Sequence, residues 1–321
     1  MKNIAAALVV FFAAQTPALA QGLPTERVTV TGAREAAIEK FIRSRAAVTR
    51  MTGKVARWKV PVCPVVYGIP PAYGDFIVQR VRAVAVSVGA PVNTDEECRG
   101  NVQIVFTTAP QALLDNIRSK YRYYLGYHDN TRQADAMTRL KRPVHAFYTT
   151  STVDLRGNRQ VDSAKTMGIE IQLPGVAGAP APGEGTALPP GGQMVTLNLP
   201  GASAMSVSGT RFLGDGLASE LQHVVMVVDT QKVLPLEMGA LADNIALQAL
   251  SQPNDLDTCQ DLASIANLTV APACDPANMT DALSAHDSAY LRGLYKSQID
   301  GAGRVQKAQI SYQMKQAAPE E

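Results

Sequence analysis

The chain has 321 residues, of which 46% are hydrophobic and 18% charged, and its formal net charge is +2 at pH 7. This length permits one large domain or two small ones with a substantial core. A net charge this small excludes a global electrostatic attraction to nucleic acid, so no nucleic-acid partner is expected.

The first 20 residues have the pattern of a cleavable secretory signal peptide. Lys2 supplies a positive start, residues 4–14 are apolar, and Ala-Leu-Ala at 18–20 is the small-x-small pattern that signal peptidase accepts. The apolar run is much shorter than the ~20 residues that a membrane-spanning helix needs. We therefore expect an exported, periplasmic or extracellular protein that begins at Gln21 and does not span a membrane. An uncleaved anchor is the alternative.

The chain contains four cysteines, Cys63, Cys98, Cys259 and Cys274. In an exported chain, four cysteines most simply form two disulfides. Among the three possible pairings, the loop lengths favour Cys63–Cys98 and Cys259–Cys274. A zinc site built from the same thiols is the competing interpretation, although the chain lacks the C-x-x-C spacing typical of such sites.

Residues 21–57 are predicted to hold an extended segment followed by a basic amphipathic helix. Residues 21–32 lack a helical pattern, whereas residues 34–50 place Ile38 and Phe41 on one apolar stripe. The positive charges of this helix are typical of a solvated face. Contact with an anionic surface is the alternative.

Residues 58–153 alternate between strand and helix patterns. Strands separated by helices of this length favour a mixed sheet with crossover connections. We therefore predict a single α+β domain over residues 58–300. Its first elements are a strand at 58–67, a helix from the Pro70-Pro71 break to Gly89, a strand at 102–107, a helix opened by Pro110, and a strand at 144–153.

The Pro/Gly-rich segment 174–192 cannot propagate a helix or a ladder. It is predicted to be a loop inserted at a hairpin tip, because residues 194–199 resume as a strand. The last third is predicted to be mostly helical, and residues 301–321 to form a polar tail. The expected helices are 215–228 with Asp215 as N-cap, 240–251, and a short helix opened by the capping box Ser284-Ala-His-Asp287.

One constellation has possible chemistry, namely Ser219-Glu220-Leu221-Gln222-His223 in the predicted helix 215–228. Zinc peptidases place H-E-x-x-H on a helix, because residues four apart lie on one face and the Glu between two imidazoles activates water. Here Ser219 replaces the first His. Glu220 is the candidate catalytic residue, and His223 is the one candidate metal ligand.

The segment from Leu283 to Tyr295 has a Leu-Ser start, an Asp and a Leu-Tyr finish. This segment resembles the closing helix of the metzincin metallopeptidases. The E-x-x-H motif and the order of the preceding elements add to the resemblance. The same combination is similar to a group of uncharacterised exported proteobacterial proteins. The resemblance covers residues 58–296 and implies a zincin-like order of elements. Carried over residue by residue, it implies that Glu220 is the general base and His223 the second zinc ligand, with Asp229 in place of the third.

Three features depart from the metzincin pattern. Ser219 cannot replace an imidazole as a zinc ligand, and Met226 stands where a Gly should turn the chain. On a straight helix Asp229 would lie about 120° from the face of His223. No cofactor is therefore expected, and Ser219, His223 and Asp229 are predicted to remain as a polar pocket.

On this basis we predict a catalytically inactive zincin-like binding or scaffolding protein of the cell envelope, with an envelope protein or a polysaccharide as its partner. The alternative is a metal-dependent hydrolase or peptidase that holds zinc with non-standard ligands around Glu220 and His223. A third interpretation makes these two residues a hydrogen-bonded polar pair on a half-buried helix. A serine hydrolase built on Ser219 and His223 is disfavoured, because a nucleophilic serine needs a strained turn and oxyanion donors.

A cluster of tyrosines forms the densest aromatic patch of the chain. Such side chains can stack on the sugar rings of a glycan, although they more often form core and rim. No Walker loop or dinucleotide fingerprint occurs in the sequence, so no nucleotide cofactor is implied. The candidate glycan-binding residues are Tyr121, Tyr123, Tyr124 and Tyr127.

Overall fold

The computed structural model describes residues 25–95, 98–154, 156–162, 169–173, 195–199, 216–270 and 274–317. The predicted signal peptide at 1–20 and the Pro/Gly-rich loop at 174–192 lie outside these residues. Within the described ranges, no helix has the length and apolar character needed to cross a membrane.

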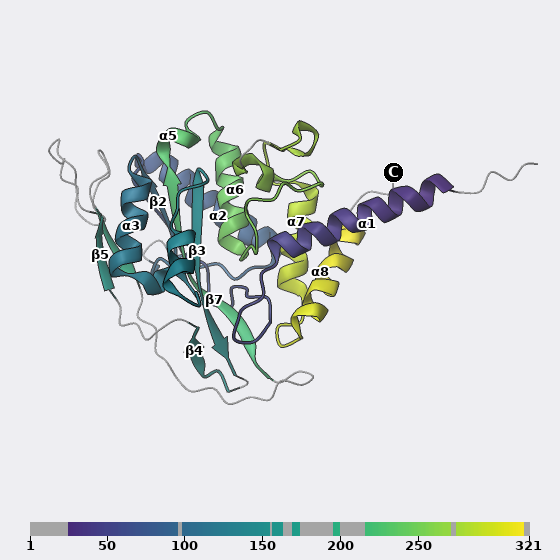
Figure 1. Cartoon of the computed structure of the whole chain (residues 1–321), viewed down its shortest axis with the longest axis horizontal. Coiled ribbons are helices and arrows are strands. Elements are labelled where there is room, and N and C mark those ends of the chain that lie inside the picture. The colour runs from purple at the N-terminus through teal and green to yellow at the C-terminus, as the bar shows by residue number, and fades with distance from the viewer. Residues whose placement is uncertain are drawn as a thin grey trace, which may run out of the picture.

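A five-stranded open sheet forms the centre of the fold, in the order β1-β2-β7-β3-β4 (Figure 1). The first three of these strands are parallel to one another, whereas β3 runs antiparallel to β7, and β4 antiparallel to β3. The predicted α+β class and mixed sheet are therefore confirmed. The strands are β1 (Pro64–Tyr67), β2 (Val102–Thr107), β3 (Val144–Val153), β4 (Arg159–Val161) and β7 (Ala218–Asp229).

A separate antiparallel pair joins β5 (Ile169–Leu173) to β6 (Val195–Leu199), with Leu173 opposite Val195. These two strands flank the Pro/Gly-rich segment. The prediction that a strand resumes after that segment is therefore confirmed.

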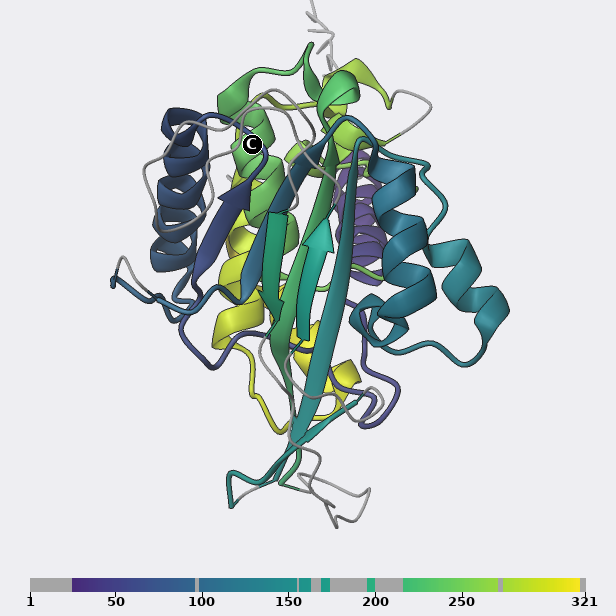
Figure 2. The same ribbon diagram turned by 90° about the vertical axis from the view of Figure 1, so that its left-hand side faces the viewer.

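Helices cover both faces of the sheet, as Figure 2 shows. On one face, α2 (Pro71–Val88) and α6 (Met238–Leu250) pack against the sheet, and on the other α3 (Pro110–Lys120) does so. Pro71 and Pro110 occupy first-turn positions, where the missing N–H costs nothing, and Gly89 ends α2 in a left-handed conformation with φ of 80°. Because both faces are covered, all six residues of β2 are buried.

The element at 218–229 is a strand, and the predicted helix at 215–228 is wrong. Strand β7 lies between β2 and β3, and only Gln222 of its residues is partly exposed. A strand that is buried on both faces has no alternating pattern, so its apolar residues also matched a helical stripe. The β-branched run Val224, Val225, Val227 and Val228 favours the strand.

The C-terminal part is helical, as predicted, but its helices continue further along the chain than expected. The capping box is confirmed, with Ser284 and Asp287 each accepting the other's backbone N–H at the start of α7 (Ala285–Lys296). The predicted polar tail at 301–321 is corrected, because α8 (Gly303–Ala317) packs on α7 and buries Ile310 and Met314 completely. A Cβ on Gly293 would lie 2.9 Å from the Ile310 Cα, so the two helices approach this closely only with glycine there.

The N-terminal helix α1 (Thr25–Arg45) begins earlier and ends earlier than predicted, so the extended segment expected at 21–32 is corrected from Thr25 onward. The predicted stripe is buried, with Ile38 and Phe41 at most 1% exposed. A Lys315–Glu35 ion pair of 2.7 Å joins α8 to α1. The remaining elements are η1 (Arg122–Leu125), α4 (Thr131–Met137), α5 (Thr230–Val233), η2 (Ile265–Thr269) and η3 (Pro276–Asn278).

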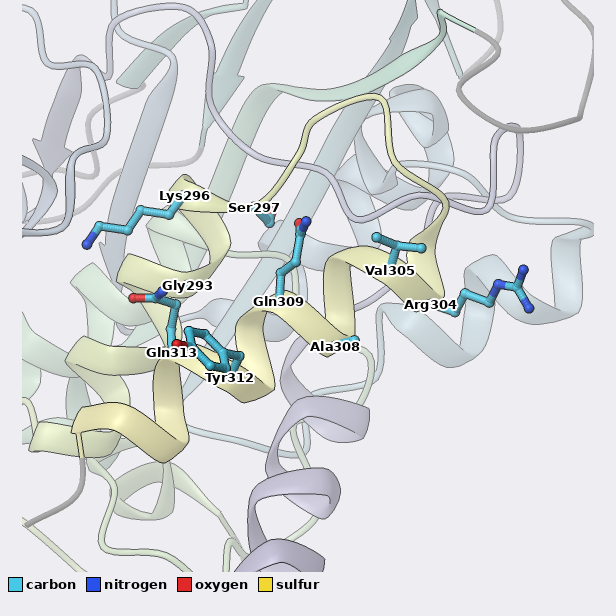
Figure 3. Close-up of a pocket in the computed structure, with 9 residues that line it drawn as sticks. All are labelled: Gly293, Lys296, Ser297, Arg304, Val305, Ala308, Gln309, Tyr312 and Gln313. Atoms are coloured by element: carbon cyan, nitrogen blue, oxygen red, sulfur yellow. The ribbon is translucent and has the colours of Figure 1, made fainter. Parts of the chain in front are cut away.

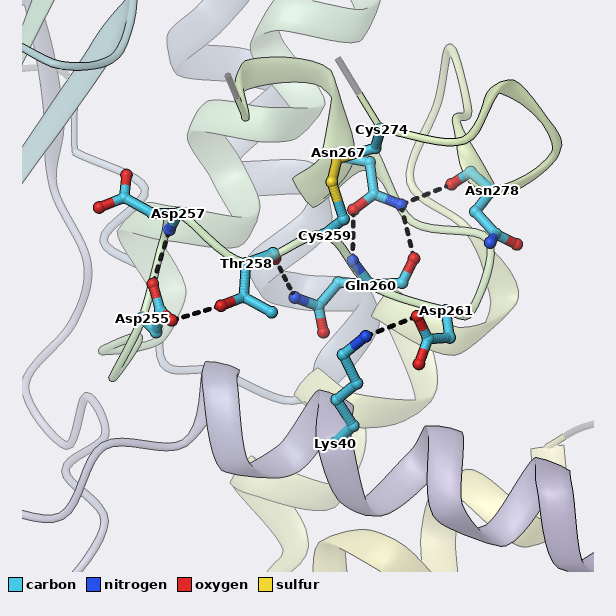
Figure 4. The surroundings of a disulfide bond; sticks show 10 residues. All are labelled: Lys40, Asp255, Asp257, Thr258, Cys259, Gln260, Asp261, Asn267, Cys274 and Asn278. Carbon is cyan, nitrogen blue, oxygen red and sulfur yellow. Dashed lines mark hydrogen bonds and ion pairs between the residues drawn. A yellow bond between two sulfur atoms is a disulfide. The ribbon is translucent and has the colours of Figure 1, made fainter. Parts of the chain in front are cut away.

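Both predicted disulfides are confirmed. The Cα atoms are 6.0 Å apart in Cys63–Cys98 and 5.6 Å apart in Cys259–Cys274. All four thiols are thus used, which excludes the competing zinc site made of cysteines. The second disulfide lies in the segment between α6 and α7, where Asn267 accepts from the Gln260 N–H at 2.7 Å (Figure 4).

Candidate functional site

Glu220 and His223 lie on one face of the sheet because of a β-bulge. Thr149 of β3 is opposite His223, and Thr150 is opposite Leu221, so Gln222 is an extra residue in β7. On a regular strand, residues three apart point to opposite faces, but one extra residue restores them to the same face. The sequence predicted a shared face correctly, although from the wrong secondary structure.

The Glu220 carboxylate is engaged in two ion pairs. It is 3% exposed, accepts from Arg159 Nη2 at 2.8 Å through Oε2, and lies 3.8 Å from Lys59 Nζ through Oε1. Arg159 belongs to the short edge strand β4, whereas Lys59 precedes β1. Glu220 therefore ties the edge strand β4 and the segment before β1 to β7.

His223 is buried, and neither of its ring nitrogens has a hydrogen-bond partner in the described structure. Burial lowers its pKa to about 3, so the imidazole is neutral at pH 7. The Ser219 hydroxyl instead lies within 2.7 Å of Thr49 Oγ1 and 2.6 Å of Thr52 Oγ1.

The predicted pocket of Ser219, His223 and Asp229 is not assembled. Ser219 shares the opposite face with Leu221, and Asp229 lies about 20 Å along the strand from His223. The Asp229 carboxylate caps α5 by accepting from the Gln231 N–H at 3.1 Å. Over the described residues, no three His, Cys, Asp or Glu side chains gather closely enough to hold a metal ion.

Helix α6 carries a set of buried polar side chains that the sequence analysis missed. Asn244 donates from Nδ2 to the Ile265 carbonyl at 2.8 Å, and Gln248 donates from Nε2 to Asn244 Oδ1 at 2.6 Å. Asp243 accepts from Arg80 of α2 and from the Leu283 N–H. In the sequence, the signal for this set was the presence of three polar residues within an otherwise apolar helix.

A polar cleft of about 430 Å³ lies between β3 and the segment 252–257 that follows α6. The loop 47–50 and Tyr127 complete its walls. The end of α6 is tied to β3, because the Tyr148 hydroxyl donates to the Gln248 carbonyl at 2.9 Å. In this cleft, polar side chains of several elements meet solvent together.

Charges of both signs line the cleft. Arg142 donates from Nη1 to Asp257 Oδ1 at 2.6 Å. The Asp162 carboxylate accepts from Thr150 at 2.6 Å, and burial raises its pKa. Next to Arg142, burial and the nearby positive charge lower the pKa of His145 to about 4, and its Nε2 accepts from the Lys141 N–H at 3.0 Å.

The predicted tyrosine patch is divided between core and surface. Tyr124 is buried, and its ring lies 6.4 Å from the partly exposed Tyr121 ring. Tyr127 is 40% exposed, lines the cleft, and donates to Asp129 at 3.1 Å. The Tyr123 side chain lies outside the described part of the structure. Of the described tyrosines in the patch, Tyr127 is therefore exposed and Tyr121 partly exposed, and the glycan hypothesis rests on these two.

A second cavity, of about 690 Å³, follows the surface between α7 and α8 (Figure 3). It is mainly apolar and includes the exposed Tyr312 ring, with Lys296 and Arg304 at its border. Among the described residues, none of those that line it has a buried polar atom without a hydrogen-bond partner, in contrast to Arg142 in the cleft beside β3.

No protein-family model matches the chain, and no significant match was found among the curated proteins or among the solved structures.

Proposed function

We propose that the protein is a catalytically inactive, zincin-like binding protein of the cell envelope, and that it binds its partner in the cleft between β3 and residues 252–257. The observation that carries this proposal is the row of amide side chains on α6 and just beyond it. These amides stand at the spacing of a metzincin zinc site.

The order of elements supports the placement of that site on α6. The alternating series from β1 to α3 is followed by α4, by the strands β3 to β7 and by the short α5, and it leads to α6 instead of ending at the mistaken helix 215–228. The closing segment is also connected to α6. Asp287 of α7 accepts from the Ile265 N–H at 2.9 Å, and the Ile265 carbonyl accepts from Asn244.

The metzincin pattern H-E-x-x-H-x-x-G-x-x-H can be laid on this helix in one alignment, in which none of its five specified residues is present and Ser251 stands at the Gly position. With Asn244 at the first His, Gln248 takes the second and Asn254 the third, while Ile245 takes the place of the general base. Zinc selects imidazole, thiolate or carboxylate ligands, and a neutral amide is a poor substitute. An isoleucine has no group that accepts a proton from water.

The side-chain amides of Asn244 and Gln248 also form hydrogen bonds within the fold. Both are at most 1% exposed, and they bond to each other and to the Ile265 carbonyl. Asn254 lines the cleft. The proposed binding cleft thus contains the residue that takes the third-ligand position in this alignment, which is the reason for assigning binding to it.

Metal analysis of the purified protein tests this proposal. We expect no stoichiometric zinc and no zinc-dependent hydrolysis of casein. Stoichiometric zinc that disappears in His223→Ala would instead establish the alternative, a metal-dependent hydrolase around Glu220 and His223.

A gain-of-binding variant tests the alignment itself. The triple variant Asn244→His, Gln248→His and Asn254→His is expected to bind one zinc ion. The matched control, Asn254→His alone, should bind none. Circular dichroism establishes that both are folded, and a folded triple variant without zinc affinity would contradict the alignment.

A further inference from the structure

We infer that the outer surface of α3, η1 and α4 binds a membrane that contains anionic phospholipids, through five exposed cations that have no carboxylate partner. This surface is distinct from the proposed binding cleft and would hold a different partner. The five residues, which we call the basic surface, are Lys120, Arg122, Arg132, Arg139 and Lys141.

Positive charge is concentrated in residues 118–142. This stretch contains seven lysines and arginines but two aspartates, whereas the whole chain contains 30 cationic and 28 acidic residues. The remainder of the chain therefore has a net negative charge. A region of one sign on a molecule of the other sign attracts oppositely charged partners and also orients the molecule toward them.

Carboxylates of the fold do not neutralise the basic surface. Arg118 takes two of the nearby aspartates, since its guanidinium lies 3.9 Å from Asp115 and 3.2 Å from Asp135. The third, Asp129, lies 4.0 Å from Arg50. Within the part of the chain that the structure describes, no ion pair involves a residue of the basic surface. Its five charges can therefore interact with a partner.

Three of the cations lie where α3 ends and α4 begins. Lys120 is the last residue of α3, and Arg122 is the first residue of η1. Arg122 donates from Nη1 to the Thr131 hydroxyl at 3.1 Å, which places the first turn of α4, with Arg132, beside it. Figure 2 shows α4 at the periphery of the molecule. These three charges are therefore close together on an outer edge.

The other two cations lie toward the opposite end of α3. Gln111, near the start of this helix, bonds to the Thr138 carbonyl at 3.0 Å and to the Leu140 N–H at 2.9 Å, so Arg139 and Lys141 follow the same contact. Helix α3 has 11 residues and is therefore about 16 Å long. The charges thus extend well beyond the size of one phosphate, which favours an extended anionic partner.

The surroundings of the basic surface favour a membrane as that partner. Neither the cleft beside β3 nor the cavity between α7 and α8 includes any of the five cations, so they do not enclose a small anion there. Tyr121 lies between Lys120 and Arg122 in the chain and is partly exposed. Tyrosine beside lysine and arginine is typical of the interface between a membrane and water, where anionic headgroups attract the cations.

The N-terminal helix α1, which was the basic stretch noted in the sequence, lacks this property. Lys40 pairs with Asp261 at 2.6 Å, and Arg43 lies 3.5 Å from Glu39. Arg45 is buried. Cations that are paired or buried contribute little to the attraction of an anionic surface. That attraction is therefore expected from α3, η1 and α4 instead.

Co-sedimentation with vesicles of defined composition tests the inference. The protein that begins at Gln21, so that the apolar residues 4–14 cannot insert, is mixed with vesicles of equal parts phosphatidylcholine and phosphatidylglycerol, or of phosphatidylcholine alone. We expect binding to the anionic vesicles only. This binding should disappear at about 1 M salt, where the Debye length is about 3 Å.

A triple variant locates the binding surface. Each cation near an anionic leaflet contributes about fivefold to the affinity, so loss of three should weaken binding about 100-fold. Circular dichroism establishes that the variant is folded. The substitutions are Lys120→Gln, Arg122→Gln and Arg132→Gln.

A matched control removes the same net charge at other exposed positions. Its binding should stay within about threefold of the original, since these positions are far from the vesicle surface and are screened. The control substitutions are Arg43→Gln, Lys296→Gln and Arg304→Gln.

Three results overturn the inference, namely equal binding to both kinds of vesicle, no binding to either, and equal losses in the two triple variants. Immobilised heparin tests the other class of polyanion. Retention on heparin that requires the basic surface, in a protein that does not bind the anionic vesicles, would assign this surface to an acidic polysaccharide and also overturn the inference.

Discussion

Two polar regions of the sheet differ in what surrounds them. Around the bulge of β7, Glu220 and His223 are buried, and the carboxylate is fully engaged in ion pairs. In the cleft beside β3, by contrast, Arg142, Asp257 and Tyr127 reach solvent. The residues whose types suggest catalysis, Glu220 and His223, thus lie where a ligand has no access. The accessible polar residues lie in the cleft between β3 and the segment that follows α6.

The comparison shows that residue type alone is a poor guide to function. A buried Glu with two cationic partners ties segments together, whereas polar side chains that line a cleft and reach solvent can contact a ligand. If this distinction is correct, variants near the bulge should change stability, and variants in the cleft should change binding.

The largest expected effect is the pH dependence caused by His223. Its pKa is about 3 in the folded protein and near 6.5 when unfolded, so the unfolded state binds the additional proton. Stability is therefore retained above pH 6.5 and lost as the pH falls toward 3. Between pH 7 and pH 4 this one group accounts for about 3 kcal/mol of the free energy of unfolding.

Urea unfolding at a series of pH values measures this effect. His223→Leu should remove most of the loss between pH 6.5 and pH 4 without lowering stability at pH 7, because the imidazole has no bond to lose. The residual slope should include His145, whose pKa is also lowered, to about 4. If the free energy of unfolding depends on pH in the variant as it does in the original protein, His223 contacts water in the folded state.

The next effect is the loss of the Glu220 charge. Glu220→Gln leaves Arg159 and Lys59 without their common partner, but both cations are partly exposed and regain water. We therefore expect a loss of about 2 kcal/mol, less than for a pair that is buried on both sides. Asp257→Asn is the matched control in the cleft, and its effect should stay within about 0.5 kcal/mol. Equal losses in the two variants would remove the distinction between the regions.

Much of the framework was predictable from local patterns. Proline at the first turn, glycine at the end of α2 and the Ser284–Asp287 capping box act through nearby backbone, so their effect is readable in sequence. The disulfide pairing followed from loop length in the same way. The α+β class could be predicted because its signals are local.

The candidate site depended on tertiary structure and was missed. Strand β7 is apolar on both faces, so periodicity could not distinguish it from a buried helix. That error placed the metzincin resemblance on Glu220 and His223, whereas the alignment that we propose uses Asn244 and Gln248 of α6. Arg45 belonged to a basic helix and was interpreted as a solvated charge, whereas the folded chain buries it.

The smallest expected change in stability, and the sharpest test of the cleft, comes from Tyr127→Ala. The ring is 40% exposed and its hydroxyl contacts only Asp129 among the described residues, so the free energy of unfolding should change by less than about 0.5 kcal/mol. The same substitution removes apolar surface from the wall of the proposed binding cleft, so its effect should appear in binding and not in stability.

Retention on insoluble cell-wall material tests whether the partner of the cleft is a glycan. Retention that Tyr127→Ala leaves unchanged would point to a protein partner. Retention that is lost in a folded Tyr127→Ala variant would assign Tyr127 to sugar stacking. The accessible region would then bind a glycan, and the buried region around β7 would still be structural, so the contrast between the two regions would hold with either partner.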